Sequence, residues 1–293
     1  MVKRAGFVAL AGRPNAGKST FVNYVLGEKV SIVSDKPQTT RNKILGIYHG
    51  EDVQIGFLDL PGIHKPKYKM NRMMMRSVSN GLEDADLIFH FLDLSVPFGS
   101  GDRYVSDFLA SRDVPVILVL NKMDLINRGK AIPKIEKLHQ ELQPAELVPI
   151  SAMSGDNVDR LLELAKRFLP EGENLFPEDE LTDQPLRFMV QEFIREKLLH
   201  FTRDEIPHAV AVTIESFKEF QESIEITAVI WVEKKTQRRI VLGSGGQMIK
   251  KVRLAAQRSL KKLLDKPFEL ELVVKVKENW RENDSLFDDL RLI

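Results

Sequence analysis

The feature that most constrains this chain is the run Gly-Arg-Pro-Asn-Ala-Gly-Lys-Ser at residues 12–19, which has the spacing of a phosphate-binding P-loop. The apolar residues 6–11 before it predict a buried strand, and residues 20–26 after it have the apolar spacing of a helix. The alternative is a glycine-rich turn that only joins two elements, but the flanking strand and helix favour a phosphate site. The pattern therefore predicts that the chain binds a nucleoside triphosphate.

The residue types of this loop match the chemistry of phosphate binding. Gly12 and Gly17 let the backbone bend so that successive N–H groups face the phosphates, and the following helix adds the positive end of its dipole. Lys18 supplies a mobile positive charge for the outer phosphates, and Ser19 supplies a hydroxyl ligand for Mg²⁺. The predicted nucleotide-binding residues of the loop are Gly12, Asn15, Ala16, Gly17, Lys18, Ser19 and Thr20.

The order of apolar runs predicts two domains. Up to about residue 169, short apolar runs alternate with helical patterns, which is typical of a mostly parallel sheet with helices on both faces. The strand candidates after the first are residues 43–48, 53–58, 87–92, 116–120 and 147–150. An acidic stretch with prolines follows at residues 170–185. We therefore predict an α/β domain at residues 1–172, a linker at 173–184 and a smaller α+β domain at 185–293.

The second domain has a different order of patterns. We expect a helix at residues 187–201, followed by strands near residues 208–216 and 223–232. Residues 239–242 look like a short strand before the glycine-rich turn at 243–246, and a helix at 247–264 and a strand at 268–277 follow.

Composition limits the class of protein. The chain has no cysteine, which excludes disulfides and cysteine-based metal sites or catalysis. No signal peptide precedes the first strand and no apolar stretch is long enough to span a bilayer, so we expect a cytoplasmic protein. The net charge is only +1, but no acidic residue lies between Lys234 and Leu264. This basic stretch could bind RNA or anionic lipid, which leaves open a peripheral contact with the inner face of the cell membrane.

Two short motifs in the first half indicate which base is bound. Asn121, Lys122 and Asp124 follow the strand candidate 116–120, so the carboxylate lies at the end of a strand where α/β sheets bind nucleotides. A carboxylate there can accept the ring N–H and the exocyclic amine of guanine, and it has no comparable pairing with adenine. After the last strand candidate, Ser151, Ala152 and Met153 can bring a backbone N–H to the guanine oxygen.

Two further motifs indicate a sensor of the terminal phosphate. Asp59 follows the strand candidate 53–58 and supplies an acid near Mg²⁺, and Gly62 can donate its N–H to the terminal phosphate. In the loop between the first helix and the second strand, a threonine hydroxyl can complete the Mg²⁺ shell. We favour Thr40 over Thr39 for this role, and the choice between them stays open. The predicted metal ligands are thus Ser19, Thr40 and Asp59.

In this order and spacing, the motifs make the first half resemble the translation-factor class of P-loop GTPases. The resemblance implies hydrolysis of GTP to GDP with Mg²⁺, and we expect Lys18, Thr40 and Gly62 to act in catalysis. Ile63 stands where Ras-like GTPases have a water-orienting glutamine, so slow intrinsic turnover is expected. In similar GTPases with a hydrophobic residue at this position, the residue matching Asn15 binds K⁺, which extends the expected cofactors to K⁺.

The glycine-rich turn of the second domain indicates a nucleic-acid contact. Glycines before a helix let the backbone approach a phosphate chain, and lysines on the helix add charge. The alternative is a solvated amphipathic helix after a tight turn. The order of helices and strands, however, resembles a type II KH domain, which implies binding of single-stranded RNA. The predicted RNA-binding residues are Gly243, Ser244, Gly245, Gly246, Lys250 and Lys251.

A GTPase half followed by a KH half resembles the Era family of bacterial ribosome-assembly GTPases over nearly the whole chain. The segments that carry the resemblance are residues 29–40, 245–251 and 274–281. It implies binding near the 3′ end of small-subunit ribosomal RNA, with GTP favouring the RNA-competent arrangement of the two domains. We also expect a monomer whose partner is the small ribosomal subunit. Ser244 departs from the basic residue common in that family's loop, which removes one possible phosphate contact. The alternatives are a constitutive RNA-binding protein whose nucleotide domain is structural, and a GTPase of transfer-RNA modification.

Overall fold

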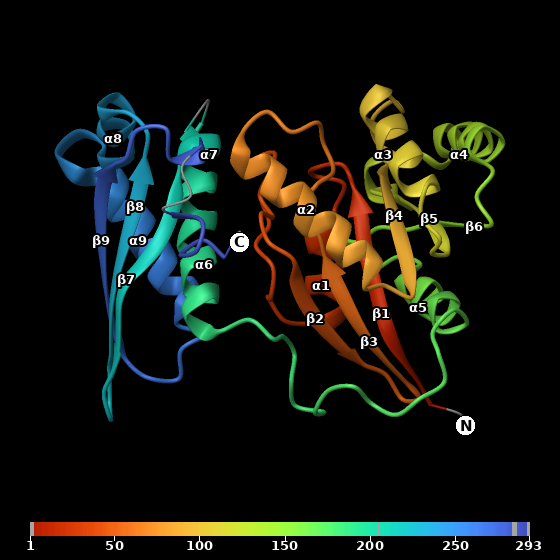
Figure 1. Cartoon of the computed structure of the whole chain (residues 1–293), viewed down its shortest axis with the longest axis horizontal. Helices are drawn as coiled ribbons and strands as arrows, with labels where there is room; N and C mark the ends of the chain where they lie inside the picture. Colours follow the sequence, from red (N-terminus) through yellow and green to blue (C-terminus); the bar gives the residue numbers. More distant parts are fainter. Residues whose placement is uncertain (1–2, 204–205, 283–285, 292–293) are drawn as a thin grey trace. The chain divides into compact units, whose positions relative to one another are not determined.

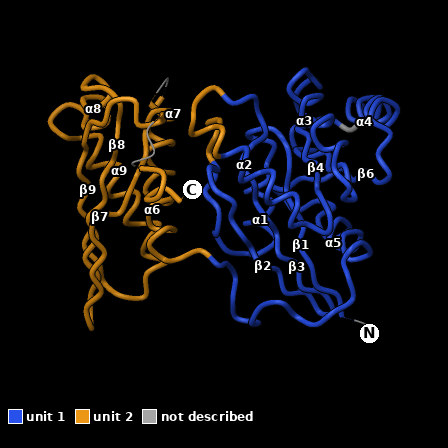
Figure 2. Tube along the Cα trace, in the orientation of Figure 1, with its two compact units in different colours: residues 1–33, 40–66, 74–183 blue, residues 34–39, 67–73, 184–293 orange. Residues whose placement is uncertain are grey.

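The computed structural model describes residues 3–203, 206–282 and 286–291, without the side chain of Arg128, and the chain divides into two compact units (Figure 2). The first unit comprises the chain up to Val33, Thr40–Pro66 and Met74–Asp183. The second comprises Ser34–Thr39, Lys67–Met73 and the chain from Gln184 onward. Two short segments from the first quarter of the sequence therefore belong to the second unit.

A six-stranded sheet forms the centre of the first unit (Figure 1). Its strand order is β2-β3-β1-β4-β5-β6, and only β2 runs antiparallel to its neighbour. The strands are β1 (Arg4–Gly12), β2 (Ile44–His49), β3 (Val53–Asp59), β4 (Leu87–Asp93), β5 (Val116–Asn121) and β6 (Glu146–Pro149). The helices are α1 (Lys18–Leu26), α2 (Lys69–Glu83), α3 (Ser100–Ala110), α4 (Arg128–Leu142) and α5 (Val158–Lys166), with a 3₁₀ turn at Met123–Leu125.

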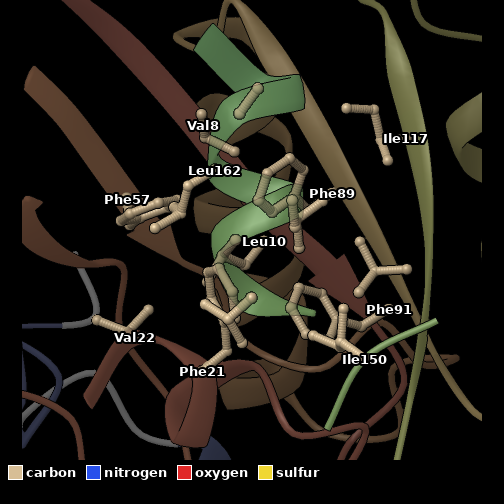
Figure 3. Close-up of a cluster of buried hydrophobic side chains, with 14 of the residues drawn as sticks. Val8, Leu10, Phe21, Val22, Phe57, Phe89, Phe91, Ile117, Ile150 and Leu162 are labelled. Atoms are coloured by element: carbon tan, nitrogen blue, oxygen red, sulfur yellow. The ribbon is translucent and has the colours of Figure 1, made fainter. Parts of the chain in front are cut away.

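Apolar side chains alternate between the two faces of this sheet and so fix where the helices pack. On one face, Phe21 of α1 lies among Phe57, Phe89 and Phe91 of the strands, with ring centroids 5.4 to 5.9 Å apart (Figure 3). Helix α5 completes that layer. On the other face, Ala9 contributes to a cluster with residues of α2 and α3. The predicted α/β class, with helices on both faces of a mostly parallel sheet, is confirmed.

The acidic stretch that ends the first unit lies along the edge of its sheet. The carbonyl oxygen of Leu181 accepts from the Ile47 N–H at 2.9 Å, and the Thr182 hydroxyl donates to the Leu45 carbonyl at 2.6 Å. Gln54 of β3 binds the backbone of Phe176 through both ends of its amide. These bonds cover part of the exposed edge that β2 would otherwise present.

The second unit is built on a three-stranded sheet in the order β7-β8-β9, in which the first pair is antiparallel and the second parallel. Its strands are β7 (Ala211–Glu219), β8 (Ile224–Val232) and β9 (Phe268–Val276). Its helices are α6 (Leu186–Phe201), α7 (Ile206–Ala209), α8 (Lys235–Leu242) and α9 (Gln247–Leu260), with 3₁₀ turns at Ser244–Gly246 and Trp280–Glu282. The predicted smaller α+β fold is confirmed.

Three element predictions in this unit were wrong. Residues 239–242, predicted as a strand, form the end of α8, because Gln237 accepts the N–H groups of Glu233 and Lys234 and starts a helix there. The strand predicted from residue 208 begins at Ala211, after α7. The helix predicted to residue 264 ends at Leu260, where tighter turn bonds replace the helical ones. None of the described helices is long and apolar enough to cross a membrane.

His90, in the middle of β4, gives the fold a specific pH dependence. The side chain is 4% exposed, and burial lowers its pKa from 6.5 to about 4, with the Asp102 charge acting in the opposite direction. Between pH 6.5 and pH 4 the unfolded chain gains a proton at this site that the folded chain does not. We therefore expect the free energy of unfolding to fall by up to about 3 kcal/mol as the pH decreases through this window.

Urea unfolding of nucleotide-free protein at pH 7 and pH 4.5 tests this expectation. His90→Gln should remove most of the pH-dependent loss, because glutamine does not titrate. The exposed His139→Gln is the matched control and should retain the wild-type loss. An equal loss in all three proteins would show that His90 is not its source.

Candidate nucleotide site and glycine-loop surface

The P-loop connects the end of β1 to the start of α1. Gly17 has φ +98°, and a Cβ there would lie 2.1 Å from the Asn121 amide nitrogen, so only glycine fits. The Gly62 backbone packs equally closely on the other side of the loop, since a Cβ on Gly62 would lie 2.5 Å from the Pro14 nitrogen. The phosphate loop is thus held between two other motifs that the sequence predicted.

Lys18 is buried in this loop. Its Nζ lies 3.2 Å from the Arg13 carbonyl oxygen and 3.5 Å from that of Gly12. Burial lowers its pKa from 10.5 to about 8, and the nearby Asp59 charge acts in the opposite direction. A bound phosphate would add negative charge beside this ammonium group and so offset the cost of its burial.

Three oxygen-bearing side chains meet at the start of α1. The Ser19 hydroxyl donates to Asp59 Oδ2 at 2.6 Å and lies 3.0 Å from the Thr40 hydroxyl. Asp59 is fully buried, burial raises its pKa, and its Oδ1 has no hydrogen-bond partner among the residues that the structure describes. The Thr39 hydroxyl is turned away and donates to the Lys36 carbonyl at 2.7 Å.

This trio fits Mg²⁺, because hard oxygen donors and an uncompensated carboxylate are what that ion requires. When bound, Mg²⁺ would neutralise charge on the phosphates of the nucleotide. Ser19, Thr40 and Asp59 would hold it, and Lys18 would remain at the phosphates.

The predicted base-recognition motifs lie at the same edge of the sheet, because β1, β4, β5 and β6 are consecutive in it. Asn121 joins them: its amide donates to the Ala16 carbonyl at 2.8 Å, and its oxygen accepts from the Ala152 N–H at 2.9 Å. The Ser151 hydroxyl donates to Asp124 Oδ1 at 2.6 Å and orients the carboxylate, which is on an exposed residue. Met153 is 72% exposed.

Two ion pairs in this site had no signal in the sequence. Lys122 pairs with Asp93 at the end of β4 at 2.6 Å, and Arg13 of the P-loop pairs with Asp102 of α3 at 3.0 Å. Each partner comes from a different strand or helix, so only the folded arrangement reveals the pair. The acids connect the predicted base-recognition loop to β4 and the P-loop to α3.

Ile63 is buried, with 1% exposure, and packs in the cluster beneath α2 and α3. Its N–H donates to the Gly12 carbonyl at 2.9 Å. The residue therefore fixes the Asp59–Gly62 loop to the P-loop, and its side chain has no polar atom for a water molecule.

In the second unit, the glycine-rich turn joins α8 to α9 with an unusual backbone. Gly243, Gly245 and Gly246 all have positive φ, at 73°, 56° and 77°. A Cβ on Gly245 or Gly246 would meet no described atom within 4 Å, so the space beside the turn is open. Ser244 in the turn and Lys250 and Lys251 near the start of α9 are exposed, and the Lys251 ammonium lies 4.4 Å from the centre of the Phe201 ring.

The fold and these two surfaces define a class: a P-loop GTPase joined to a type II KH domain. A family profile described as a 50S ribosome-binding GTPase matches residues 7–122, and a KH domain profile matches residues 205–281. The chain belongs to the Era family of GTPases, because it is 38% identical to solved Era structures over almost its whole length.

Two solved structures carry this assignment. The crystal structure of Era in complex with MgGDPNP and nucleotides 1506–1542 of 16S ribosomal RNA is 38% identical, with a TM-score of 0.94, covering 99% of this chain and 98% of that chain. The crystal structure of an Aquifex aeolicus Era variant bound to GDP·AlF₄⁻ is also 38% identical, with a TM-score of 0.93 and the same coverage.

Proposed function

We propose that this protein is a GTP-hydrolysing switch that binds the 3′ region of small-subunit ribosomal RNA and acts in assembly of the small ribosomal subunit. The observation that carries the proposal is the convergence of Ser19, Thr40 and Asp59 beside Lys18, on a chain similar from end to end to Era in complex with 16S RNA. The GTPase profile, whose description mentions the 50S ribosomal subunit, matches less than half of the chain. The similarity to Era in complex with 16S RNA covers almost the whole chain, so we favour the small subunit as the partner.

The predicted residues have the following proposed roles. Lys18, Thr40 and Gly62 stabilise the terminal phosphate during hydrolysis, and Ser19, Thr40 and Asp59 hold Mg²⁺. Asp124 selects guanine, and Asn121 keeps the base and phosphate loops together. The remaining nucleotide contacts are Gly12, Asn15, Ala16, Gly17, Thr20, Lys122, Ser151, Ala152 and Met153. Because Ile63 cannot orient water, intrinsic turnover is slow.

The RNA would approach the open turn at Gly243–Gly246, where the backbone and the start of α9 can contact phosphates while Lys250 and Lys251 add charge. We propose that the functional boundary between the GTPase and KH domains lies in the stretch 173–184. We also infer a monomer that works in the cytoplasm, where ribosomal subunits assemble. A peripheral membrane contact through the basic stretch 234–264 and a K⁺ ion at Asn15 remain proposals, the latter tested by comparing turnover in K⁺ and Na⁺.

The competing function is a constitutive RNA-binding protein with a structural nucleotide domain. A buried Lys18 without a phosphate, and a buried Asp59 with an oxygen unpartnered among the described residues, both destabilise the empty fold. A purely structural domain would have no reason to retain them. A GTPase of transfer-RNA modification would not need the KH domain.

GTP turnover with and without a single-stranded 3′ fragment of 16S RNA tests the proposal. We expect slow hydrolysis that the fragment accelerates, and no hydrolysis by Asp124→Asn at micromolar GTP. No stimulation by the fragment would indicate that the two domains act independently and would favour the competing function.

Gly246→Asp is expected to weaken binding of the same RNA fragment roughly tenfold or more, because it places a negative charge in the open space where phosphates would lie. Aspartate is among the residues best suited to the positive φ of this position, so the strain should be small enough for the fold to persist. Gly172→Asp is the matched control, since a Cβ there also meets no described atom within 4 Å. Fluorescence anisotropy of labelled RNA measures both. Equal affinity of the two variants would remove the turn from the RNA site.

A further inference from the structure

Arg195 of α6 is among the most deeply buried charged residues described, with 1% of its surface exposed. Glu192, one turn earlier on the same helix, accepts hydrogen bonds from its Nε at 2.7 Å and from its Nη2 at 2.5 Å. Such a buried pair is costly to form, and it becomes much more costly when a bonding partner is removed. The position of the guanidinium group is therefore closely fixed.

The third partner of this guanidinium is a backbone group outside the KH sequence. Nη2 of Arg195 also donates to the carbonyl oxygen of Thr39. Thr39 ends the segment Ser34–Thr39, which packs within the second unit although it lies between α1 and β2 in the sequence (Figure 2). The Thr39 hydroxyl is used within the same segment, on the Lys36 carbonyl.

The next residue is Thr40, whose hydroxyl lies 3.0 Å from Ser19 Oγ in the proposed Mg²⁺ site. The Thr39 carbonyl and the Thr40 N–H belong to one planar peptide group. Fixing the carbonyl oxygen therefore also fixes the orientation of the bond that leads to the Thr40 Cα. The chain passes between the two units at this peptide bond. A single peptide group thus separates the carbonyl that Arg195 binds from Thr40.

The segment Lys67–Met73 shows the same relation after the Asp59–Gly62 loop, and it too packs in the second unit. The Arg281 guanidinium lies 4.2 Å from the centre of the Tyr68 ring, and Glu282 accepts from the Lys69 N–H at 3.2 Å. Both segments that adjoin the predicted phosphate sensors are thus held by charged side chains of the second unit.

We propose that Arg195 is a positioning residue for GTP hydrolysis, which holds Thr40 at the Mg²⁺ site through the Thr39 carbonyl and so couples the state of the nucleotide to the KH unit. The inference rests on the proposed function. Thr40 is required when the terminal phosphate and Mg²⁺ order its loop, and it is released after hydrolysis. The hydrogen bond from Arg195 to the Thr39 carbonyl should therefore stabilise the GTP-bound state more than the GDP-bound state. By linkage, the KH unit should change the affinity for GTP by the same factor as GTP changes the affinity of the KH unit for its ligand.

The test compares affinities for GDP and for a non-hydrolysable GTP analogue in Mg²⁺. In Arg195→Lys we expect the analogue to bind about tenfold more weakly and GDP to bind unchanged, a loss of about 1.4 kcal/mol for one charge-assisted hydrogen bond. The matched control is Arg187→Lys, since Arg187 also lies on α6 and donates to a carbonyl, that of Ile214 in β7. It should leave both affinities at wild-type values.

A double-mutant cycle separates positioning from a merely structural effect. Because Arg195 acts through Thr40, Arg195→Lys should cause no further loss in a Thr40→Ala background. Additive losses, or equal weakening of GDP and the analogue, would overturn the inference. If Arg195→Lys does not fold, Glu192→Gln loosens the same guanidinium and should lower the analogue affinity in the same direction by about threefold. An unchanged analogue affinity in folded Glu192→Gln would also overturn it.

Affinity for the 16S 3′ fragment completes the experiment. In the wild type the analogue-bound protein should bind the fragment more tightly than the GDP-bound protein, and in Arg195→Lys this difference should shrink. A wild type that binds the fragment equally in both states contradicts the proposed function. A difference that survives intact in Arg195→Lys contradicts only the role of Arg195.

Discussion

Asp124→Asn is expected to weaken GTP binding roughly 100- to 1,000-fold, because two charge-assisted hydrogen bonds to the guanine edge are lost together. The carboxylate only accepts hydrogen bonds, whereas the amide of asparagine brings an N–H₂ group against the N–H groups of guanine. The fold should be unaffected, since the asparagine oxygen can still accept from the Ser151 hydroxyl. Titration calorimetry in Mg²⁺ measures the loss.

Xanthosine triphosphate separates this specific effect from general damage. It carries a carbonyl where guanine has its amine, so the amide introduced by Asp124→Asn can donate to it, and the variant should bind it more tightly than GTP. Asp156→Asn, an exposed residue of the loop after Ser151, is the matched control and should bind GTP normally. Weak binding of both nucleotides by Asp124→Asn would mean that Asp124 does not read the base.

Lys18→Met should change nucleotide affinity and stability in opposite directions. Methionine retains a chain of similar length without the charge, so GTP affinity should fall roughly 100-fold. Burial lowers the pKa of Lys18 from 10.5 to about 8, so at pH 7 the folded protein holds a charged ammonium group in an unfavourable environment. Without that group, the free energy of unfolding of the nucleotide-free protein should rise by about 1 to 3 kcal/mol at pH 7.

Urea unfolding in EDTA without nucleotide measures the stability change, and calorimetry with Mg²⁺ and GTP measures the affinity. Lys130→Met, at an exposed position of α4, should change neither quantity beyond a few tenths of a kcal/mol. If Lys18→Met lowered the free energy of unfolding as well as the GTP affinity, Lys18 would be a structural residue. It would then not be a phosphate ligand whose burial destabilises the nucleotide-free fold.

Sequence patterns predicted where most of the candidate nucleotide site lies, because the P-loop, Asp59, Asn121 and Ser151 each come at or just after the end of a strand. Once β1, β3, β5 and β6 are placed in one sheet with parallel strand ends, the P-loop, Asp59, Asn121 and Ser151 must lie at the same edge. The side-chain partners within that edge depend on packing. Asp102 reaches Arg13 from α3, and Asp93 reaches Lys122 from the end of β4. No spacing rule indicates either pair.

The second unit was harder to predict for two physical reasons. The apolar run 240–242 within the predicted strand 239–242 is too short to distinguish a strand from the end of a helix. The capping contacts of Gln237 favour the helix. The contact of Arg195 with the Thr39 carbonyl joins residues 156 positions apart, and a sequence read in one pass offers no sign of it. Local spacing specifies elements and loops, whereas long-range packing specifies which side chains hold them.

Titration calorimetry of the full chain with GTP, GDP and ATP in Mg²⁺ is the most direct test of the central claim, that the first unit binds a guanine nucleotide with its metal. We expect saturable heat with GTP and GDP at a stoichiometry of one, and none with ATP at the same concentrations. Folded protein that takes up neither guanine nucleotide, or that takes up ATP equally well, would contradict the account.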